Sequence, residues 1–309
     1  MRKLALLAFC LALFFGQASS GYASDLSKFR RLVVFGDSLS DNGNSLFLFS
    51  LPQPPYYSGR WSNGPNWVDY FPSVADHFPT VAAHFPDPDS RNGTNFAVGG
   101  AISADLLESE PAGFPAQIQA YLASTGGRAS ADNLYVIWIG ANDFSAGVSP
   151  SVTAESIRGG IAQLRQAGAR AFVVITVPDI SLTPTVIAAG GAVVQAAKLF
   201  VFAVNSLLEA EILPFGWLPD TKIDLVDINL IFTQLVLDPA KFGFSNSTGA
   251  AFNPGLPLSP SNPVSDPDDY IFWDGFHPTT KAHHIAAEYI YRTITRVFRE
   301  DRLVRRARP

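Results

Sequence analysis

Residues Arg31-Leu-Val-Val-Phe-Gly36-Asp37-Ser38-Leu39 decide the fold that this chain can adopt. A continuous apolar run of this kind is typical of a strand buried on both faces of a parallel sheet. Gly36 lets the backbone turn where the run ends, and the polar residues that come next favour a turn or a helix start. The sequence therefore predicts that Ser38 lies at the carboxyl end of a central strand, the edge where open α/β sheets bind ligands.

Two later segments that we expect to be buried strands end in the same way. Residues 94–98 lead into Gly99 and Gly100, and residues 134–139 lead into Gly140, Ala141 and Asn142. Further strands are expected at 171–177 and 222–228. Helices are expected at 66–77, 114–122, 153–167, 188–212 and 279–299, and a short helix is expected between the strand at 222–228 and about residue 237. Regular alternation of strands and helices predicts right-handed crossovers and a parallel sheet covered on both faces.

The amino terminus has the layout of a secretory signal peptide. Arg2 and Lys3 precede an apolar run over residues 4–15, and small and polar residues continue up to Ala23. This pattern predicts a signal peptide over residues 1–23 and a secreted or periplasmic protein. The run is too short to span a bilayer, and no later segment is expected to be long and apolar enough, so we expect no transmembrane anchor.

The remaining chain, residues 24–309, contains no internal repeat or linker and is interpreted as a single domain. Segments 46–61 and 241–269 are rich in proline, which favours loops over regular helix or central strand. The only cysteine, Cys10, lies inside the predicted signal peptide, so disulfides and thiol chemistry are not expected. A formal net charge of −5 argues against nucleic acid as a partner.

A nucleophile, a base and an orienting acid occur at the two ends of the chain. The stretch Asp274-Gly-Phe-His277-Pro278 puts a carboxylate and an imidazole three residues apart across a turn. His277 would take the proton of Ser38, and Asp274 would hold the imidazole in the useful tautomer. The developing oxyanion would need the Ser38 backbone N–H, a glycine N–H and the Asn142 amide as donors.

Each of these residues also has a plain structural explanation. Gly99 and Gly100 would allow tight packing, Asn142 would cap a turn, and His277 would be an ordinary loop histidine. A metal enzyme is a further alternative, with Asp274, His277, His283 and His284 as ligands. Adjacent histidines on a helix point about 100° apart, and no His-Glu-x-x-His spacing occurs, so no metal or other cofactor is expected.

Four blocks of the sequence resemble those of the SGNH hydrolases, also called GDSL esterases and lipases. These blocks are Gly36-Asp-Ser38-Leu39, Gly99-Gly100, Gly140-Ala-Asn142-Asp143 and Asp274-Gly-Phe-His277-Pro278. The resemblance implies an α/β fold, a three-layer α/β/α sandwich around a five-stranded parallel sheet, and ester hydrolysis without a metal. It also implies Ser38, Asp274 and His277 as the catalytic triad, and Ser38, Gly100 and Asn142 as the oxyanion hole, with Gly100 chosen over Gly99 from the block pattern.

The segment directly after Ser38 is rich in large apolar side chains. We expect Phe47, Phe49, Tyr57 and Trp61 to bind substrate there, although packing of these aromatics on the core explains them equally well. The preferred function is a secreted serine esterase or lipase acting on a small-molecule or lipid ester. A phospholipase or lipid acyltransferase would share every catalytic residue. A polysaccharide deacetylase is less favoured because these loops are apolar, and a secreted binding protein on the same fold is the alternative outside enzymes.

Overall fold

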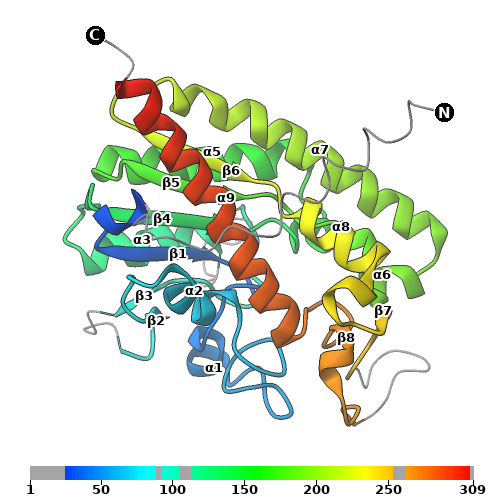
Figure 1. Ribbon diagram of the computed structural model, residues 1–309. Coiled ribbons are helices and arrows are strands. Elements are labelled where there is room, and N and C mark those ends of the chain that lie inside the picture. The colour runs from blue at the N-terminus through cyan, green and yellow to red at the C-terminus, as the bar shows by residue number, and fades with distance from the viewer. Residues whose placement is uncertain (1–24, 88–91, 105–112, 253–261, 307–309) are drawn as a thin grey trace, which may run out of the picture.

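A computed structural model describes residues 25–87, 92–104, 113–252 and 262–306 (Figure 1). The predicted signal peptide lies outside the described residues. The main sheet has six parallel strands in the order β2-β3-β1-β4-β5-β6. Their bounds are β1 (Arg31–Gly36), β2 (Ala82–Ala83), β3 (Gly93–Asn95), β4 (Asn133–Trp138), β5 (Ala171–Ile175) and β6 (Lys222–Val226).

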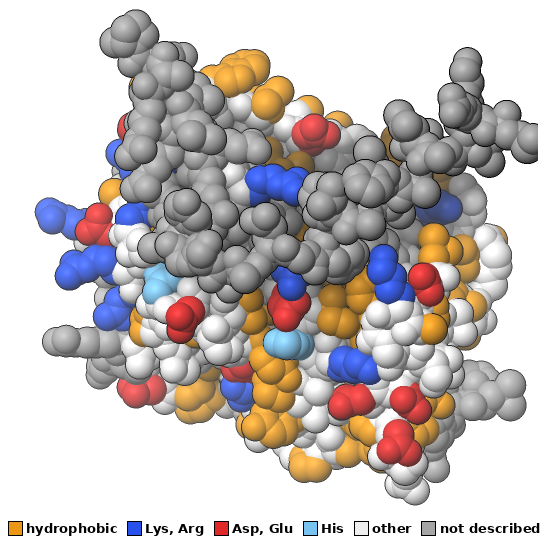
Figure 2. All heavy atoms as spheres, in the orientation of Figure 1, with side chains coloured by type: hydrophobic (Ala, Val, Ile, Leu, Met, Phe, Trp, Pro, Cys, Tyr) orange, Lys and Arg blue, Asp and Glu red, His pale blue; other side chains and the backbone are white. Residues whose placement is uncertain are grey.

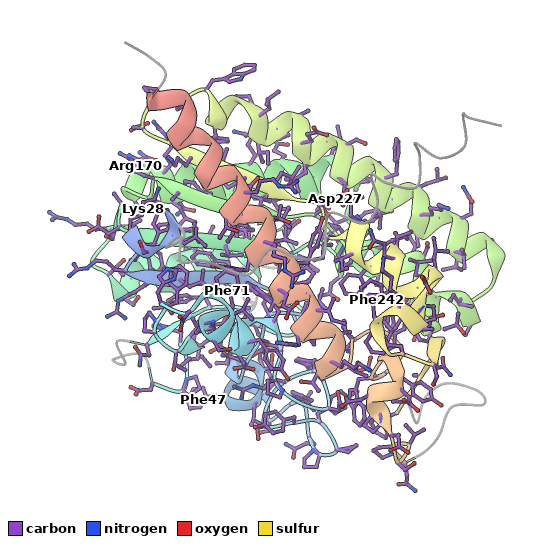
Figure 3. The ribbon with its side chains drawn as sticks, viewed as in Figure 1. Lys28, Phe47, Phe71, Arg170, Asp227 and Phe242 are labelled. Atoms are coloured by element: carbon purple, nitrogen blue, oxygen red, sulfur yellow. The ribbon has the colours of Figure 1, made fainter. Side chains whose placement is uncertain are left out.

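Helices cover both faces of this sheet, so the predicted three-layer α/β/α architecture is confirmed. Alternate residues of β1 separate the two cores, because successive strand side chains point to opposite faces. Leu32 and Val34 pack toward α2 (Trp67–Ala75) and α9 (Thr280–Arg306). Val33 and Phe35 pack toward α3 (Phe114–Ser124), α5 (Pro150–Ala167) and α7 (Gly191–Gly216). Figure 1 shows α9 crossing the near face of the sheet, and Figure 3 marks Phe71 in the core beneath it.

The sheet has one strand more than the five that were expected. β2 is two residues long and pairs with β3 at the sheet edge. Two residues are too few to leave an alternating pattern in the sequence, so this strand could not be predicted.

The register of β1 places the ends of the central strands together. It pairs with β4 from Arg31 opposite Asn133 to Gly36 opposite Trp138. Val34 on its other side lies opposite Asn95 of β3. The residues just after these three strands therefore meet at one edge of the sheet.

Several expected boundaries were wrong. The helix expected at 188–212 is α7, which begins at Gly191 and ends at Gly216. A separate short helix, α6 (Pro184–Ala188), precedes it, and Gly190 between them has a φ of 96°, which is not helical. The first part of segment 46–61 lies in α1 (Asn44–Phe49), and segment 241–269 contains β7 (Asn246–Ala250), which pairs with β8 (Tyr270–Phe272). The remaining helices are α4 (Asp143–Ala146), α8 (Asn229–Leu237), and the 3-10 turns η1 (Asp25–Lys28), η2 (Ile180–Leu182), η3 (Pro239–Phe242) and η4 (Pro267–Asp269).

Helix α7 corrects the expectation that no later segment is apolar and long enough to cross a membrane. Its length and composition would both allow it to do so. In the structure it packs on α5, and it also exposes large side chains such as Phe202, 73% exposed. Figure 2 shows other surface hydrophobic side chains over α8 and α1, among interspersed acidic and basic ones.

Candidate active site

Ser38, His277 and Asp274 form a hydrogen-bonded chain at the carboxyl edge of the sheet. The distance from Ser38 Oγ to His277 Nε2 is 2.8 Å, and the distance from His277 Nδ1 to Asp274 Oδ2 is 2.7 Å. Ser38 comes after β1, whereas the other two lie in the turn between β8 and α9. The structure thus brings together the three residues that the sequence proposed as a triad, in the geometry required for nucleophile, base and orienting acid.

The turn holds one of the two carboxylate oxygens of Asp274. Its Oδ1 atom accepts the backbone N–H groups of Phe276 and His277, at 2.8 and 2.7 Å. Trp273 N–H donates to the His277 carbonyl at 2.8 Å, which closes the turn. With Oδ1 held by the backbone, Oδ2 is the oxygen that faces the imidazole.

Burial and charge act against each other in this pair. Burial disfavours ionised Asp274, but the neighbouring His277 and the two backbone donors prevail and hold the pKa of Asp274 below its usual value. Burial likewise disfavours protonated His277, but the Asp274 carboxylate prevails and raises the pKa of His277. The imidazolium that forms when His277 takes a proton is therefore stabilised by Asp274.

A second carboxyl group, Asp37, lies beside the triad. Its Oδ1 atom accepts the Leu39 N–H at 3.0 Å, while Oδ2 is buried and has no hydrogen-bond partner among the described residues. Burial raises the pKa of Asp37 to about 7. The neutral form of this carboxyl group is therefore favoured more than in an exposed aspartate.

The glycines after β3 differ in whether their N–H groups are available. Gly99 N–H donates to Asp41 Oδ2 at 2.9 Å and to Ser45 Oγ at 2.7 Å, so it is already engaged. Within the described part of the chain, the N–H groups of Gly100 and Ser38 make no hydrogen bond. Gly100 also has a φ of 79°, which favours glycine at this position. This geometry favours Gly100 over Gly99 as an oxyanion donor.

Asp41 organises the loop that carries these glycines, a role that the sequence analysis did not assign. Its two oxygens accept N–H groups from Gly43, Asn44 and Ser45 as well as from Gly99. The polar run after Ser38 was visible in the sequence, but its partner in a loop 58 residues away was not.

Asn142 begins α4 and faces the same loop. Its Nδ2 atom donates one hydrogen to the Ala101 carbonyl at 2.9 Å, which leaves the second hydrogen of the amide for another acceptor. The adjacent Asp143 is buried and bonds Ser103 and Thr153, which holds α4 against the glycine loop.

Replacing Asn142 by alanine should lower kcat by roughly 100- to 1,000-fold, because an oxyanion donor acts mainly on the transition state and contributes about 2.7 to 4 kcal/mol. KM should change little. Steady-state kinetics and thermal unfolding of the wild-type and Asn142→Ala proteins measure kcat, KM and Tm and so check this prediction. If Tm falls while kcat per folded molecule holds, Asn142 only shapes the loop.

A cavity of about 340 Å³ opens at Ser38 and His277. Its walls come mainly from residues after β4, from η2 and α6, and from β8, and they are largely apolar. These apolar lining residues are Leu39, Ala141, Phe144, Ile180, Leu182, Val186, Phe232, Phe272 and Phe276. A larger groove of about 710 Å³ between α7 and β6 holds none of the triad residues.

The side chains expected to bind substrate are distributed differently. Phe47 and Phe49 lie on α1, are 60% and 45% exposed, and are not among the cavity-lining residues; Figure 3 shows Phe47 on the outer side of α1. Tyr57 is exposed near the Arg60 guanidinium. Trp61 alone of the four contacts the triad, with its ring 5.4 Å from the His277 ring. A binding role for these four residues stays a prediction. The apolar residues that line the cavity were missed because they are distant from one another in the sequence.

Among the described residues, no three His, Cys, Asp or Glu side chains are grouped as a metal site would require. His283 is buried in α9, and burial lowers its pKa to about 3. His284 instead packs against the Tyr70 ring at an interplanar angle of 58°, with 4.8 Å between ring centroids.

Residues 32–290 match the family model described as GDSL-like Lipase/Acylhydrolase, and the chain belongs to this family. It is 26% identical to Lipase 1 of Photorhabdus luminescens over 89% of its own length, and it spans 52% of that protein. It is 28% identical to a phosphatidylcholine-sterol acyltransferase of Aeromonas hydrophila, with 84% of this chain and 88% of that protein covered. A crystal structure of a lipolytic G-D-S-L family member from Veillonella parvula aligns with a TM-score of 0.44 and 12% identity, covering 84% of this chain and 95% of that one.

Proposed function

We propose that this protein is a serine esterase or lipase that hydrolyses carboxylic esters through an acyl-enzyme on Ser38. The observation that carries the proposal is the Ser38–His277–Asp274 chain, with two successive hydrogen bonds of 2.8 and 2.7 Å at the sheet edge. Membership of the GDSL-like lipase/acylhydrolase family supports the same reaction class.

In this mechanism Ser38 Oγ bonds to the ester carbonyl carbon while His277 Nε2 takes the hydroxyl proton. The N–H groups of Ser38 and Gly100 and the Asn142 amide stabilise the oxyanion of the tetrahedral intermediate. The carbon–oxygen bond to the alcohol then breaks, and His277 gives its proton to the leaving alcohol. Water attacks the acyl-enzyme with His277 again as base, which releases the acid and restores Ser38.

A fluorophosphonate probe tests the reaction class directly, because it reacts with an activated serine hydroxyl. The folded protein should lose esterase activity in proportion to labelling, and mass spectrometry should locate the label on Ser38. A protein that neither reacts with the probe nor hydrolyses any ester would instead be a binding protein on this fold. Activity that is removed by exhaustive chelation would favour the metal alternative.

The apolar walls of the cavity support esters with medium-length acyl chains as substrates. Each buried methylene contributes about 0.8 kcal/mol, so a chain that buries several carbons should be discriminated from acetyl by well over tenfold in kcat/KM. Lipid esters carry such chains, and two relatives above have lipid-directed names.

We expect octanoyl esters to be hydrolysed with a kcat/KM more than tenfold that of acetyl esters, and Leu182→Trp to narrow this difference. Leu182 lines the cavity, so a larger ring there would occupy the space for the distal carbons. Leu199→Trp makes the same change at a 58% exposed position of α7 and is the matched control.

A profile that is flat from acetyl to decanoyl in all three proteins would contradict an acyl site in this cavity. If Phe47→Ala and Phe49→Ala narrow the profile and Leu182→Trp does not, the acyl chain binds on α1, as the sequence suggested.

Acyl transfer to an alcohol is the second candidate, supported by the similarity to the Aeromonas acyltransferase over most of both chains. The acyl-enzyme is common to both reactions, and only the acceptor differs. Adding an alcohol acceptor to the ester assay distinguishes them: transfer gives a new ester at the expense of free acid, whereas hydrolysis gives the same free acid with or without acceptor.

The sequence pattern of residues 1–23 supports export of this enzyme, since these residues have the charge and apolar layout of a signal peptide. We propose that the enzyme acts outside the cytoplasm, as a single domain over residues 24–309. Mass spectrometry of the protein recovered from its host checks the cleavage site after Ala23.

A further inference from the structure

Tyr56 donates a hydrogen bond from its hydroxyl to Asp274 Oδ2 at 2.8 Å. This is the same oxygen that accepts His277 Nδ1–H at 2.7 Å. The other oxygen of Asp274 is occupied by two backbone N–H groups of its own turn. Among the residues that the structure describes, Tyr56 is therefore the side chain outside that turn that competes with His277 for the charge of Asp274.

Three aromatic rings hold the Tyr56 hydroxyl in this position. The Tyr56 ring makes edge-to-face or strongly inclined contacts with Trp61, Phe252 and Trp273, with centroid distances of 5.9, 5.9 and 6.1 Å. Such contacts are favourable and directional, so the ring has little freedom to turn away from Asp274.

The segment that carries Tyr56 is also attached to the residue directly after His277. Tyr57 N–H donates to the Ser62 carbonyl at 2.9 Å, and Ser62 Oγ donates to the Pro278 carbonyl at 2.9 Å. The Trp61 ring lies over the His277 imidazole. Residues 56–62 therefore contact both the base and the carboxylate that orients it.

The direction of the hydrogen bond follows from charge. His277 keeps Asp274 ionised, so the carboxylate can only accept. Burial, and then the Asp274 charge, raise the pKa of Tyr56 far above its usual value, so the phenol remains a donor at any working pH.

We propose that Tyr56 is a positioning residue of the triad, which orients Asp274 and limits how strongly that carboxylate stabilises protonated His277. The inference rests on the serine mechanism proposed above. A donor on Oδ2 draws off part of the negative charge that faces the imidazole, so loss of the Tyr56 hydroxyl should raise the pKa of His277. His277 must be neutral to accept the Ser38 proton, so the acid limb of the pH–rate profile should move upward.

Other ionisable groups face His277 and stay in place in this test. Asp37 comes directly after β1, and its ionised form, which burial disfavours, would favour protonated His277. His283 lies in α9 and stays neutral, because burial lowers its pKa to about 3. Neither group is hydrogen-bonded to Tyr56 among the described residues, so a change on removing the hydroxyl reports on Asp274.

The experiment compares Tyr56→Phe with Tyr289→Phe. Tyr289 donates its hydroxyl to the Asp227 carbonyl at 3.0 Å, so the control also loses one phenolic hydrogen bond, but away from the triad. We expect Tyr56→Phe to lower kcat roughly tenfold per fluorophosphonate-titrated site and to shift the acid limb of kcat/KM upward by about half a pH unit or more, with Tm close to that of the control. If Tyr56→Phe matches Tyr289→Phe in kcat and in the acid limb, Tyr56 is only structural and the inference is overturned.

A double-mutant cycle separates action through Asp274 from a general effect. In an Asp274→Asn background, Tyr56→Phe should cost much less than in the wild-type background; the same loss in both overturns the inference. In the wild-type protein, the Tyr56 hydroxyl proton should give a low-field NMR signal that moves on Asp274→Asn. An unmoved signal also overturns it, even if Tyr56→Phe fails to fold. Retention of activity by Ser38→Ala would instead overturn the serine mechanism itself.

Discussion

Ser38→Ala should reduce kcat by on the order of 10⁵- to 10⁶-fold, because the variant lacks the oxygen that forms the acyl-enzyme. The fold should be retained. Ser38 lies just after β1, and its side chain makes one described hydrogen bond, to His277. Removing that oxygen leaves the β-strand and both cores unchanged.

Ester hydrolysis and thermal unfolding of the purified variant check this result. Ser73→Ala is the matched control, since Ser73 is exposed on α2 and its hydroxyl makes one described hydrogen bond, to the Tyr70 carbonyl. The control should keep wild-type kcat. A folded Ser38→Ala protein with near-normal turnover would exclude the serine mechanism, and the cavity would then need another nucleophile.

His277→Ala should be about as damaging as Ser38→Ala, because the hydroxyl is a weak nucleophile until the imidazole takes its proton. Nucleophile and base act as one unit, so the Ser38→Ala/His277→Ala double variant should be no slower than either single variant. Kinetics of the three proteins, with activity expressed per folded molecule, measure this non-additivity. A double variant that is much slower than both would show that the two residues act separately.

His284→Ala distinguishes this mechanism from the metal alternative. His284 packs against the Tyr70 ring and makes no described hydrogen bond to the triad. Under the serine mechanism its loss leaves kcat unchanged, whereas a loss comparable to that of His277→Ala would favour a site that uses both histidines.

The central strands were predictable because each is a continuous apolar run. Residues 31–36 and 133–138 are buried on both faces of the sheet, and such strands have a simple sequence pattern. Ser38 and Asn142 come after these two strands, and Gly100 comes after β3, which pairs with β1, so the parallel sheet places all three at one edge.

Short or interrupted elements were not predictable in this way. β2 has two residues, and β7 lies within a stretch rich in polar and turn-forming residues, so neither shows the alternation of apolar and polar residues that indicates a strand. The break between α6 and α7 depends on the backbone of Gly190, and a glycine inside a helical pattern does not by itself end the helix.

The substrate cavity could not be predicted from the sequence for another reason. Its lining combines residues after β1, after β4, around η2, and from α8 and β8. The sequence placed the acyl site on the aromatic run after Ser38 because those residues are adjacent in the chain. The short helix α1 turns Phe47 and Phe49 toward solvent, which depends on how that helix packs.

By itself, the sequence determined the parallel sheet and the residues proposed as nucleophile, base and oxyanion donors, since these depend on local hydrophobic runs and on the residue types at the end of each strand. The tertiary structure alone decided which glycine N–H is available, because Asp41 occupies that of Gly99 from a distant turn. It also decided that Tyr56 reaches Asp274 across 218 residues. Hydrogen bonds between distant segments form only when the core brings those segments together, and they have no periodic pattern in the chain.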